Sequence, residues 1–260
     1  MLLAIDIGNT NIVWGVYSQG QWIEQWRMLS SLDRPANSYS VALQSLLLES
    51  NLKTSDFEGI ILSSVVPSLI PTIEEACKAL FGKEVLILNA TIYDDLPIGI
   101  LNPKEIGTDL VANALGAYQL FREACIVVDF GTALTFTTID RQGKIVGVAI
   151  APGLKTAMFA LYKNTAQLPE VPLELPDSAL GKDTVHALQA GVLMGYIGLV
   201  ESLLNRIETE LGVPCKKVAT GGLSSIIEPL QKHFDWIDIN LTLEGLRWVW
   251  ELVQAKKSHK

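Results

Sequence analysis

The sequence predicts an α/β fold made of two duplicated domains, and three observations predict it. A short apolar run ends in an Asp-x-Gly turn twice, at Asp6 and at Asp129. Each turn precedes a hairpin whose Gln-Gly pair ends 14 residues after the Asp, at Gly20 (6 to 20) and Gly143 (129 to 143). The 260 residues of the chain are enough for two cores of about 100 residues or more each. A repeat with a period near half the chain indicates that one structural unit is duplicated.

The composition is that of a globular protein, with 49% apolar and 18% charged residues. A formal charge of −8 argues against partners that need a basic surface, so we expect no nucleic acid and no membrane. The first residues lack the pattern of a signal peptide, and a cytoplasmic location is expected. Cys77, Cys125 and Cys215 are too scattered for a disulfide framework or a metal finger, so we expect buried, inert thiols.

The first domain is expected at residues 1–115, with the element order β-β-β-α-β-α-β. Residues 2–5 are an apolar run typical of a buried strand, and Gly20 suits the tight turn of the hairpin that follows. The remaining elements follow from strand and helix periodicity. Strands are expected at 12–17, 22–28, 59–64 and 85–88, and helices at 38–48 and 68–80.

A helix is expected at 108–122, where the apolar residues Leu110, Ala114, Leu115, Tyr118 and Phe121 lie on one helical face. We expect this helix to connect the two domains across a cleft.

The second domain is expected at residues 116–260. The apolar run at 125–128 and the Thr-rich run at 134–139 are read as strands, and a Pro-rich surface loop is expected at 165–176. The other elements are a strand at 145–150, a long helix at 184–211, a strand at 217–220, and helices at 223–233 and 243–256.

Each Asp-x-Gly turn is a candidate phosphate-binding loop, and we expect the two turns to face one cleft. Gly8 and Gly131 allow backbone N–H groups to approach phosphate oxygens. The side chains of Asn9, Thr10 and Thr132 add hydrogen-bond donors. Two such loops can hold a nucleoside triphosphate between them.

The carboxylates of these turns can position cations. Asp6 is expected to hold Mg²⁺ through water, because this ion keeps most of its hydration shell and is bound by few protein carboxylates. Asp129 is expected opposite it. Ordinary turn chemistry is the alternative, since Asp-x-Gly is common at strand ends. The repeated hairpin offset favours the binding interpretation.

A further glycine turn, Gly221-Gly222, follows the strand expected at 217–220. The missing side chains would let a nucleotide base or ribose lie against the backbone. A plain helix-entry loop would have the same sequence. Gly153, after Pro152, is either a turn residue or part of the site.

With these residues assembled, the chain resembles the type III pantothenate kinases, which belong to the actin-like ATPase superfamily together with acetate and sugar kinases. The matching segments are 6–11, 102–109, 129–133 and 220–222, and the likeness covers essentially the full length. The resemblance implies two actin-like (RNase H-like) domains, with mixed five-stranded sheets flanked by helices and an interdomain cleft.

The resemblance also implies an activity and its cofactors. ATP would phosphorylate the primary hydroxyl of pantothenate to 4′-phosphopantothenate, the first step of coenzyme A synthesis. The cofactors implied are Mg²⁺ and a monovalent cation, K⁺ or NH₄⁺, and the enzyme would be a cytoplasmic homodimer. An apolar helix surface at 193–197 could form the dimer contact, or it could belong to the core.

Residue roles follow from the matching positions. Asp109 falls on the general base, and its place in the first turn of the connecting helix agrees, because a helix N-terminus stabilises a carboxylate. A helix cap is the alternative role. The resemblance assigns ATP binding to Asp6, Gly8, Asn9, Thr10, Asn11, Gly131, Thr132, Gly221 and Gly222. It assigns substrate binding to Ile100, Gly107, Thr108, Asp109, Leu110 and Thr184, and the monovalent cation to Asp129.

The chain departs from the family pattern at two acceptor-side positions. The family usually has Arg where this chain has Leu110, and Tyr where it has Ile100. Leu cannot replace the planar fork of Arg as a carboxylate ligand, although Lys104 or Lys155 could compensate. Two alternatives therefore stay open: a kinase of another small hydroxylated acid or sugar, and a nucleotide-binding homologue that acts through a partner protein without transferring phosphate.

Overall fold

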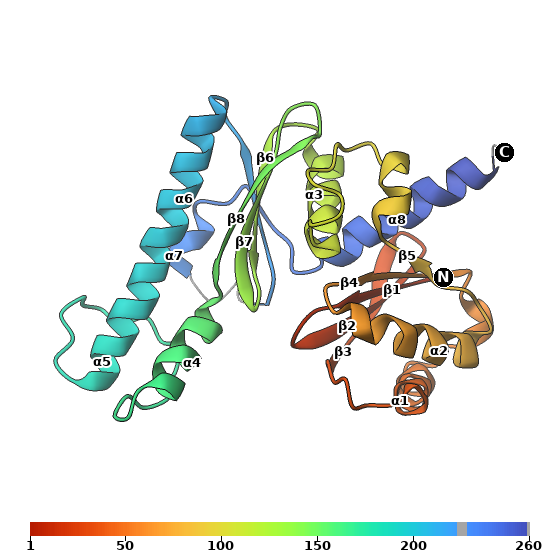
Figure 1. The fold of residues 1–260 in the computed structure, drawn as a ribbon, viewed down its shortest axis with the longest axis horizontal. Helices are drawn as coiled ribbons and strands as arrows, with labels where there is room; N and C mark the ends of the chain where they lie inside the picture. The colour runs from red at the N-terminus through yellow and green to blue at the C-terminus, as the bar shows by residue number, and fades with distance from the viewer. Residues whose placement is uncertain (223–227, 259–260) are drawn as a thin grey trace. The chain divides into compact units, whose positions relative to one another are not determined.

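The structure is a computed structural model that describes residues 1–222 and 228–258 (Figure 1). It consists of two compact units. Unit 1 comprises Met1–Gly116 and Leu241–Lys260, and unit 2 comprises Ala117–Asn240. Each unit is built on its own five-stranded sheet.

The two sheets have the same topology. In unit 1 the strands are β1 (Leu2–Ile7), β2 (Asn11–Ser18), β3 (Gln21–Leu29), β4 (Gly59–Ser64) and β5 (Leu86–Ile87), in the order β3-β2-β1-β4-β5. In unit 2 they are β6 (Cys125–Phe130), β7 (Ala133–Ile139), β8 (Ile145–Pro152), β9 (Lys216–Thr220) and β10 (Trp236–Ile237), in the order β8-β7-β6-β9-β10. In both, the hairpin strands pair antiparallel and the last two strands add in parallel. The predicted duplication and the mixed sheets are confirmed.

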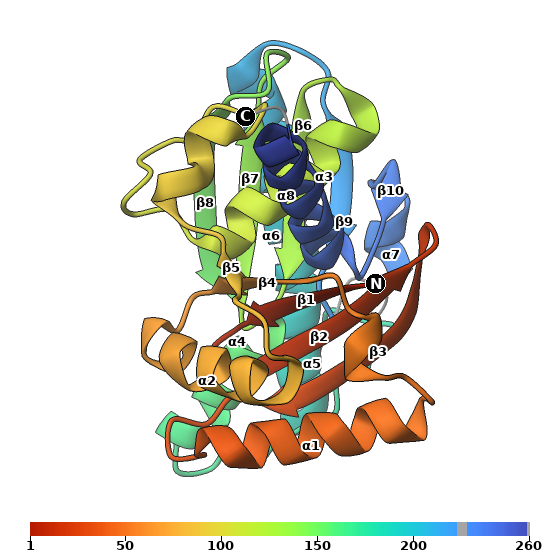
Figure 2. The ribbon, with the colours of Figure 1, turned by 90° about the vertical axis from the view of Figure 1, so that its right-hand side faces the viewer.

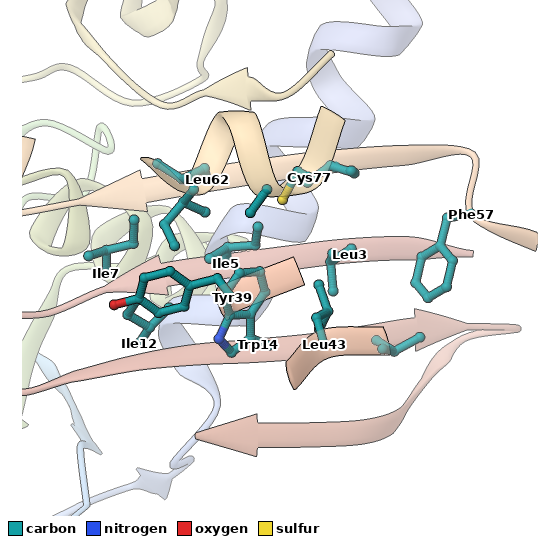
Figure 3. Packing of buried hydrophobic residues seen from close by; sticks show 14 of the residues in the cluster. Leu3, Ile5, Ile7, Ile12, Trp14, Tyr39, Leu43, Phe57, Leu62 and Cys77 are labelled. Atoms are coloured by element: carbon teal, nitrogen blue, oxygen red, sulfur yellow. The ribbon is translucent and has the colours of Figure 1, made fainter. Parts of the chain in front are cut away.

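Helices cover both faces of the first sheet. Figure 2 shows α1 (Ala36–Glu49) and α2 (Ile70–Phe81) on one side and α8 (Leu241–Ser258) on the other. Figure 3 shows Tyr39 of α1 and Cys77 of α2 packed against Ile5 and Trp14 of the sheet, all with no exposed surface. The short 3₁₀ helices of unit 1 are η1 (Thr54–Asp56), η2 (Pro67–Leu69) and η3 (Ala90–Asp95).

The final helix belongs to unit 1, whereas the predicted division had placed residues 241–260 in the second domain. Its packing gives the reason. Gly59 lies under Trp250 of α8, so closely that a Cβ atom there would come within 1.9 Å of the indole ring. Arg247 of α8 pairs with Glu244 and Glu251, and the indole of Trp22 in β3 donates to Glu244. Sequence periodicity identified the helix but not the sheet on which it packs.

The second sheet carries a long helix on one face (Figure 1). The helix begins as α5 (Thr184–Gln189), passes through a π-helical turn (Ala190–Met194) and continues as α6 (Gly195–Leu211). Its residues Leu193, Tyr196, Val200 and Leu204 pack in the core of unit 2 with Phe130. The predicted helix at 184–211 is confirmed, but Leu193 and Tyr196 are core residues and not the dimer contact considered for 193–197.

The stretch Thr184–Leu211 is the one helix in the described residues with the length and apolar composition of a membrane span. A helix that packs against a sheet in a globular core meets the same criteria. Burial of one side in the second core accounts for its apolar residues.

Both hairpin turns use the predicted Gln-Gly pair. Gln19 and Gly20 have positive φ values of 50° and 87°, and Gly143 has a φ of 80°, which favours glycine. In the second turn the Asp140 carboxylate also accepts hydrogen bonds from the backbone N–H groups of Gln142 and Lys144. The repeated turn sequence therefore has a conformational cause.

The sequence missed several short elements of unit 2. The helix α4 (Leu154–Asn164) was not predicted, and β10 is too short to show alternation. The predicted helix at 223–233 is described only as α7 (Glu228–Gln231), and residues 223–227 lie outside the described part of the chain. The connecting helix α3 (Thr108–Phe121) is confirmed, as is the irregular loop at 165–176.

Candidate active site

The first strand-end loop, residues 6–11, closes on itself at the end of β1. The N–H of Gly8 donates to the carbonyl of Asn11 at 2.9 Å, and Ser30 donates its hydroxyl to the Gly8 carbonyl at 2.6 Å. A Cβ atom on Gly8 would lie 3.2 Å from the Asn11 carbonyl, which is a tight contact. Asn9 and Thr10 are exposed at the tip. The loop therefore presents polar groups on a backbone held at its base.

The second strand-end loop, residues 129–133, has the same form in unit 2. The N–H of Gly131 donates to the carbonyl of Ala133 at 3.1 Å. The start of α4 supports the loop, because the N–H of Gly153 and the hydroxyl of Thr156 both donate to the Thr132 carbonyl, at 3.0 and 2.7 Å. Gly153 thus has a structural role, because it holds the start of α4 against the loop.

The Gly221 turn lies directly against the second loop. Gly221 has a φ of 88°, and a Cβ atom there would come within 2.4 Å of the Asp129 carboxylate and 2.7 Å of the Phe130 backbone. Strand register explains the contact, since Asp129 of β6 pairs with Thr220 of the parallel strand β9. Asp129, Gly131, Thr132 and Gly221 are therefore brought together in unit 2.

The acceptor-side residues of unit 1 meet the end of β4. The Thr108 hydroxyl lies 2.9 Å from the Ser63 hydroxyl, accepts from the N–H of Ser64 and donates to its carbonyl. Ser63 in turn pairs with Asp6 across the parallel strands β1 and β4. Thr108 thus anchors the start of α3 beside the first loop, and its hydroxyl is committed to β4.

Asp109 lies in the first turn of α3, next to this anchor. Its Oδ1 accepts from the N–H of Leu110 at 2.8 Å, and a Cβ atom on Gly107 would come within 2.4 Å of the same oxygen. Burial raises the pKa of Asp109, and hydrogen bonds from the backbone oppose the rise. The expectation that the helix end would dominate is therefore corrected, because desolvation outweighs it. A raised pKa suits a general base, which works best near the ambient pH.

The raised pKa predicts a pH-dependent stability difference between the wild type and Asp109→Asn. The folded state binds the proton more tightly than the unfolded state, so ionisation of Asp109 costs stability as pH rises from below its unfolded pKa to above its folded pKa. Near pH 3, where an ordinary Asp is largely protonated, we expect the two proteins to have equal Tm values. Near pH 7, where an ordinary Asp is ionised, we expect a higher Tm for the variant. Thermal unfolding across pH measures this, and a difference that is constant with pH contradicts it.

The other predicted acceptor residues are spread over both units. Leu110 is buried, with 7% of its surface exposed, and Ile100 is half-buried in the loop before α3. Thr184 is exposed at the start of α5 in unit 2. The N-cap of α5 is Asp183, whose carboxylate accepts from the N–H of His186, so the cap role belongs to Asp183 and not to Thr184.

The side chains at the candidate site suit a cation that keeps much of its water more than a metal ion enclosed entirely by protein ligands. In residues 1–222 and 228–258, no group of three or more His, Cys, Asp or Glu side chains could hold a metal ion. Mg²⁺ is commonly held by one or two carboxylates together with water and substrate phosphates. The single carboxylate of Asp6, near the end of β1, is compatible with that mode.

Some residues of the site were not found from the sequence. Ser63 and Thr156 make their contacts through tertiary structure, so no local pattern marks them. Tyr93 is also near the site: burial, and after it the charge of Asp109, raise its pKa. The Tyr93 position could not have been inferred from its surroundings in the sequence.

Comparisons with known proteins identify relatives of the chain. A family profile described as type III pantothenate kinase matches residues 2–206. A type III pantothenate kinase of Dehalococcoides mccartyi strain BAV1 is 40% identical over 251 residues, which cover 96% of this chain and 95% of the relative. One from Treponema pallidum strain Nichols is 43% identical over 258 residues, covering 97% and 94%.

Solved structures share the fold at low sequence identity. A Baf family protein of Campylobacter jejuni has a TM-score of 0.59 at 18% identity and covers 96% of this chain and 97% of its own. MreB 5 of Spiroplasma citri, bound to AMPPNP, has a TM-score of 0.57 at 12% identity, with 99% and 98% covered. The predicted actin-like fold is confirmed. Because the family profile spans most of the chain and the relatives match it almost end to end, the chain belongs to the type III pantothenate kinase family.

Proposed function

We propose that this chain transfers the γ-phosphoryl group of ATP to the primary hydroxyl of pantothenate, forming 4′-phosphopantothenate for coenzyme A synthesis. Within the family assignment, one observation carries the proposal. In unit 1 the first loop follows β1, and Thr108 joins the start of α3, which carries Asp109, to the end of the adjacent parallel strand β4. The link runs through the Asp6–Ser63 register and the Ser63–Thr108 contact of 2.9 Å. A base and a phosphate loop on neighbouring strand ends suit phosphoryl transfer to a small alcohol.

Asp109 is the proposed general base. Phosphoryl transfer depends mainly on positioning and charge neutralisation, so the carboxylate need only orient the attacking hydroxyl and accept its proton late. The hydrogen bond from Leu110 fixes the carboxylate, the missing side chain of Gly107 leaves room for it, and Thr108 fixes the helix start that carries it. The proposed pantothenate contacts are Ile100, residues 107–110 and Thr184.

The nucleotide is proposed to bind both strand-end loops, through Gly8, Asn9, Thr10 and Asn11 and through Gly131 and Thr132. Gly221 and Gly222 would lie near the nucleoside. Mg²⁺ would neutralise phosphate charge, with Asp6 as its ligand through water, and K⁺ or NH₄⁺ would bind at Asp129. The support for these assignments is the donor set of each loop and the absence of side chains at its glycines.

The direct test is ADP formation by the full chain with ATP, Mg²⁺, K⁺ and pantothenate. Turnover that depends on pantothenate supports the proposal. Turnover with another hydroxylated acid or sugar, but not with pantothenate, would favour a changed acceptor. Normal ATP binding without turnover on any of these acceptors would favour the homologue that acts through a partner protein.

A Leu110→Arg variant tests how the pantothenate carboxylate is held. We expect KM for pantothenate to fall, because a guanidinium can bind a carboxylate through two parallel hydrogen bonds. Leu110 is buried, so a stability loss of about 1–3 kcal/mol should accompany the change. Leu110→Met, which keeps the volume, is the control. An unchanged KM in the Arg variant would mean that other residues hold the carboxylate.

We also propose a cytoplasmic homodimer, on the strength of the family resemblance. Apolar side chains on unit 2 offer surface for a second copy, among them Ile150 of β8 at 68% exposure and Phe159 of α4 at 52%. Light scattering at micromolar concentration measures the oligomeric state, and a monomer there would count against the dimer.

A further inference from the structure

We propose that Thr135 and Thr220 complete, together with Asp129, a binding site for a monovalent cation that has shed most of its water. The inference rests on the proposed function, which has such a cation at Asp129, and it names the two hydroxyl ligands that distinguish this site from the one at Asp6.

Strand register brings the three residues together. Asp129 of β6 pairs with Thr135 of the antiparallel strand β7 and with Thr220 of the parallel strand β9. Paired residues of neighbouring strands project from the same face of the sheet. Neighbouring strands lie about 4.7–4.9 Å apart, and in antiparallel pairs the Cβ atoms lie about 4.5–5.5 Å apart. The two Thr side chains therefore flank the Asp129 side chain on one face, at the strand ends where the second loop begins.

The hydroxyl of Thr135 is buried and lacks a polar partner in the described part of the chain. Its Oγ1 atom is buried and has no hydrogen-bond partner among the described residues. Thr220, on the other side of Asp129, is 1% exposed. A buried hydroxyl without a partner is unfavourable, and in native proteins such groups commonly contact a water or an ion. A cation between the carboxylate and the hydroxyls would satisfy Thr135.

The duplicated site in unit 1 lacks this arrangement. Asp6 pairs with Val13, which has no hydroxyl, and with Ser63, whose hydroxyl is already 2.9 Å from that of Thr108. Mg²⁺ keeps several waters and needs few protein ligands, which suits Asp6. K⁺ in proteins is held by neutral oxygens that replace its hydration shell, which suits a carboxylate flanked by hydroxyls. The two copies have thus diverged in the way their two proposed ions require.

Thermal unfolding of the full chain tests the inference without relying on turnover. Tm is measured while KCl replaces choline chloride at constant ionic strength, because a cation that binds only the folded state raises Tm. Thr135→Val, which introduces the residue type found at position 13, should need about tenfold more K⁺ for half of the Tm rise, as expected for loss of a supporting ligand. Thr135→Ser keeps the hydroxyl and should behave like the wild type.

Thr137→Val is the matched control. Thr137 is also buried on β7, two residues further along the same face, where it pairs with Val127. It should leave the K⁺ response unchanged. If Thr135→Val does not fold, Thr135→Ala removes the same hydroxyl.

Three outcomes decide the matter. A shifted K⁺ midpoint in Thr135→Val, with normal midpoints in Thr135→Ser and Thr137→Val, supports the site. A midpoint within about twofold of the wild type, or no K⁺ effect on wild-type Tm, overturns it whether or not the chain makes ADP, since a lost ligand should cost at least about tenfold. The chain could also fail to phosphorylate pantothenate while Thr135→Val alone weakens its K⁺ response. That result would support the cation site and reject the proposed function.

Discussion

Asp109→Asn is expected to lower kcat by about 10²- to 10⁴-fold, the range typical of a lost general base. Asn has nearly the shape of Asp and can still accept the hydrogen bond from Leu110, but it cannot take a proton from the substrate hydroxyl. ATP binding should stay near the wild-type value, because Asp109 is proposed to act on the acceptor and not on the nucleotide. Steady-state ADP formation and calorimetric ATP titration measure the two effects.

Thr108→Ser is a useful companion to this variant. It keeps the hydroxyl that bonds to Ser63 and Ser64, so it should retain most of the activity. Near-normal turnover in Asp109→Asn would refute the catalytic assignment. A parallel loss of ATP affinity would instead place Asp109 in the nucleotide site.

The acid limb of kcat/KM provides an independent check on the same residue. Burial raises the pKa of Asp109, so activity should begin to fall at a higher pH than for an ordinary exposed Asp. The acid limb of a plot of kcat/KM against pH reports the pKa of the essential base in the free enzyme. A limb in the range of an exposed Asp would mean that the carboxylate is better solvated than its burial indicates.

Local sequence patterns predicted most of the strands, turns and helices of this fold, but not the contacts between segments far apart in the chain. Apolar runs located β1 and β6, and the two Gln-Gly turns located both hairpins because their positive φ values need residues that tolerate them. The repeat of these features revealed the duplication. Periodicity also located α8, although it could not assign that helix to unit 1, since the contact between Trp250 and Gly59 joins segments far apart in the chain.

The same limit applies to the candidate site. Loop residues such as Gly8 and Gly131 were identified because a strand-end Asp-x-Gly turn is a local signal. Ser63 and the proposed cation ligand Thr135 could not be found, since only the strand register pairs them with Asp6 and Asp129. Burial was equally hidden, and it reversed the expected effect on the pKa of Asp109.

Gly153→Ala is expected to displace the second loop, although Gly153 lies outside it at the start of α4. Gly153 has φ −64° and ψ 156°, which Ala adopts without strain, so the cost comes entirely from contacts. A Cβ atom would lie 2.2 Å from the Gly131 carbonyl and 2.5 Å from the Thr132 carbonyl. Both are backbone atoms of the proposed phosphate loop, so the loop must move away from the start of α4.

This displacement of the loop in Gly153→Ala should lower both the stability of the protein and its affinity for ATP. Overpacking costs about 1–3 kcal/mol and occasionally more, which corresponds to a Tm decrease of about 2–4 °C per kcal/mol for a protein of this size class. Displacement of Gly131 and Thr132 should weaken ATP binding by about tenfold or more, since 1.4 kcal/mol is one factor of ten. Differential scanning fluorimetry and calorimetric ATP titration measure the two effects.

Gly191→Ala is the matched control, because the added Cβ of this helical glycine would lie within 4 Å of no described atom beyond its chain neighbours and its own helix backbone. Ala is favoured over Gly inside a helix by about 0.5–1 kcal/mol, so this variant should be slightly more stable than the wild type and bind ATP normally. If Gly153→Ala matched Gly191→Ala in both measurements, α4 would not support the loop as its hydrogen bonds to Thr132 indicate. If Gly153→Ala lowered Tm but left ATP binding unchanged, the loop would be structural, and the phosphates would have to be held without it.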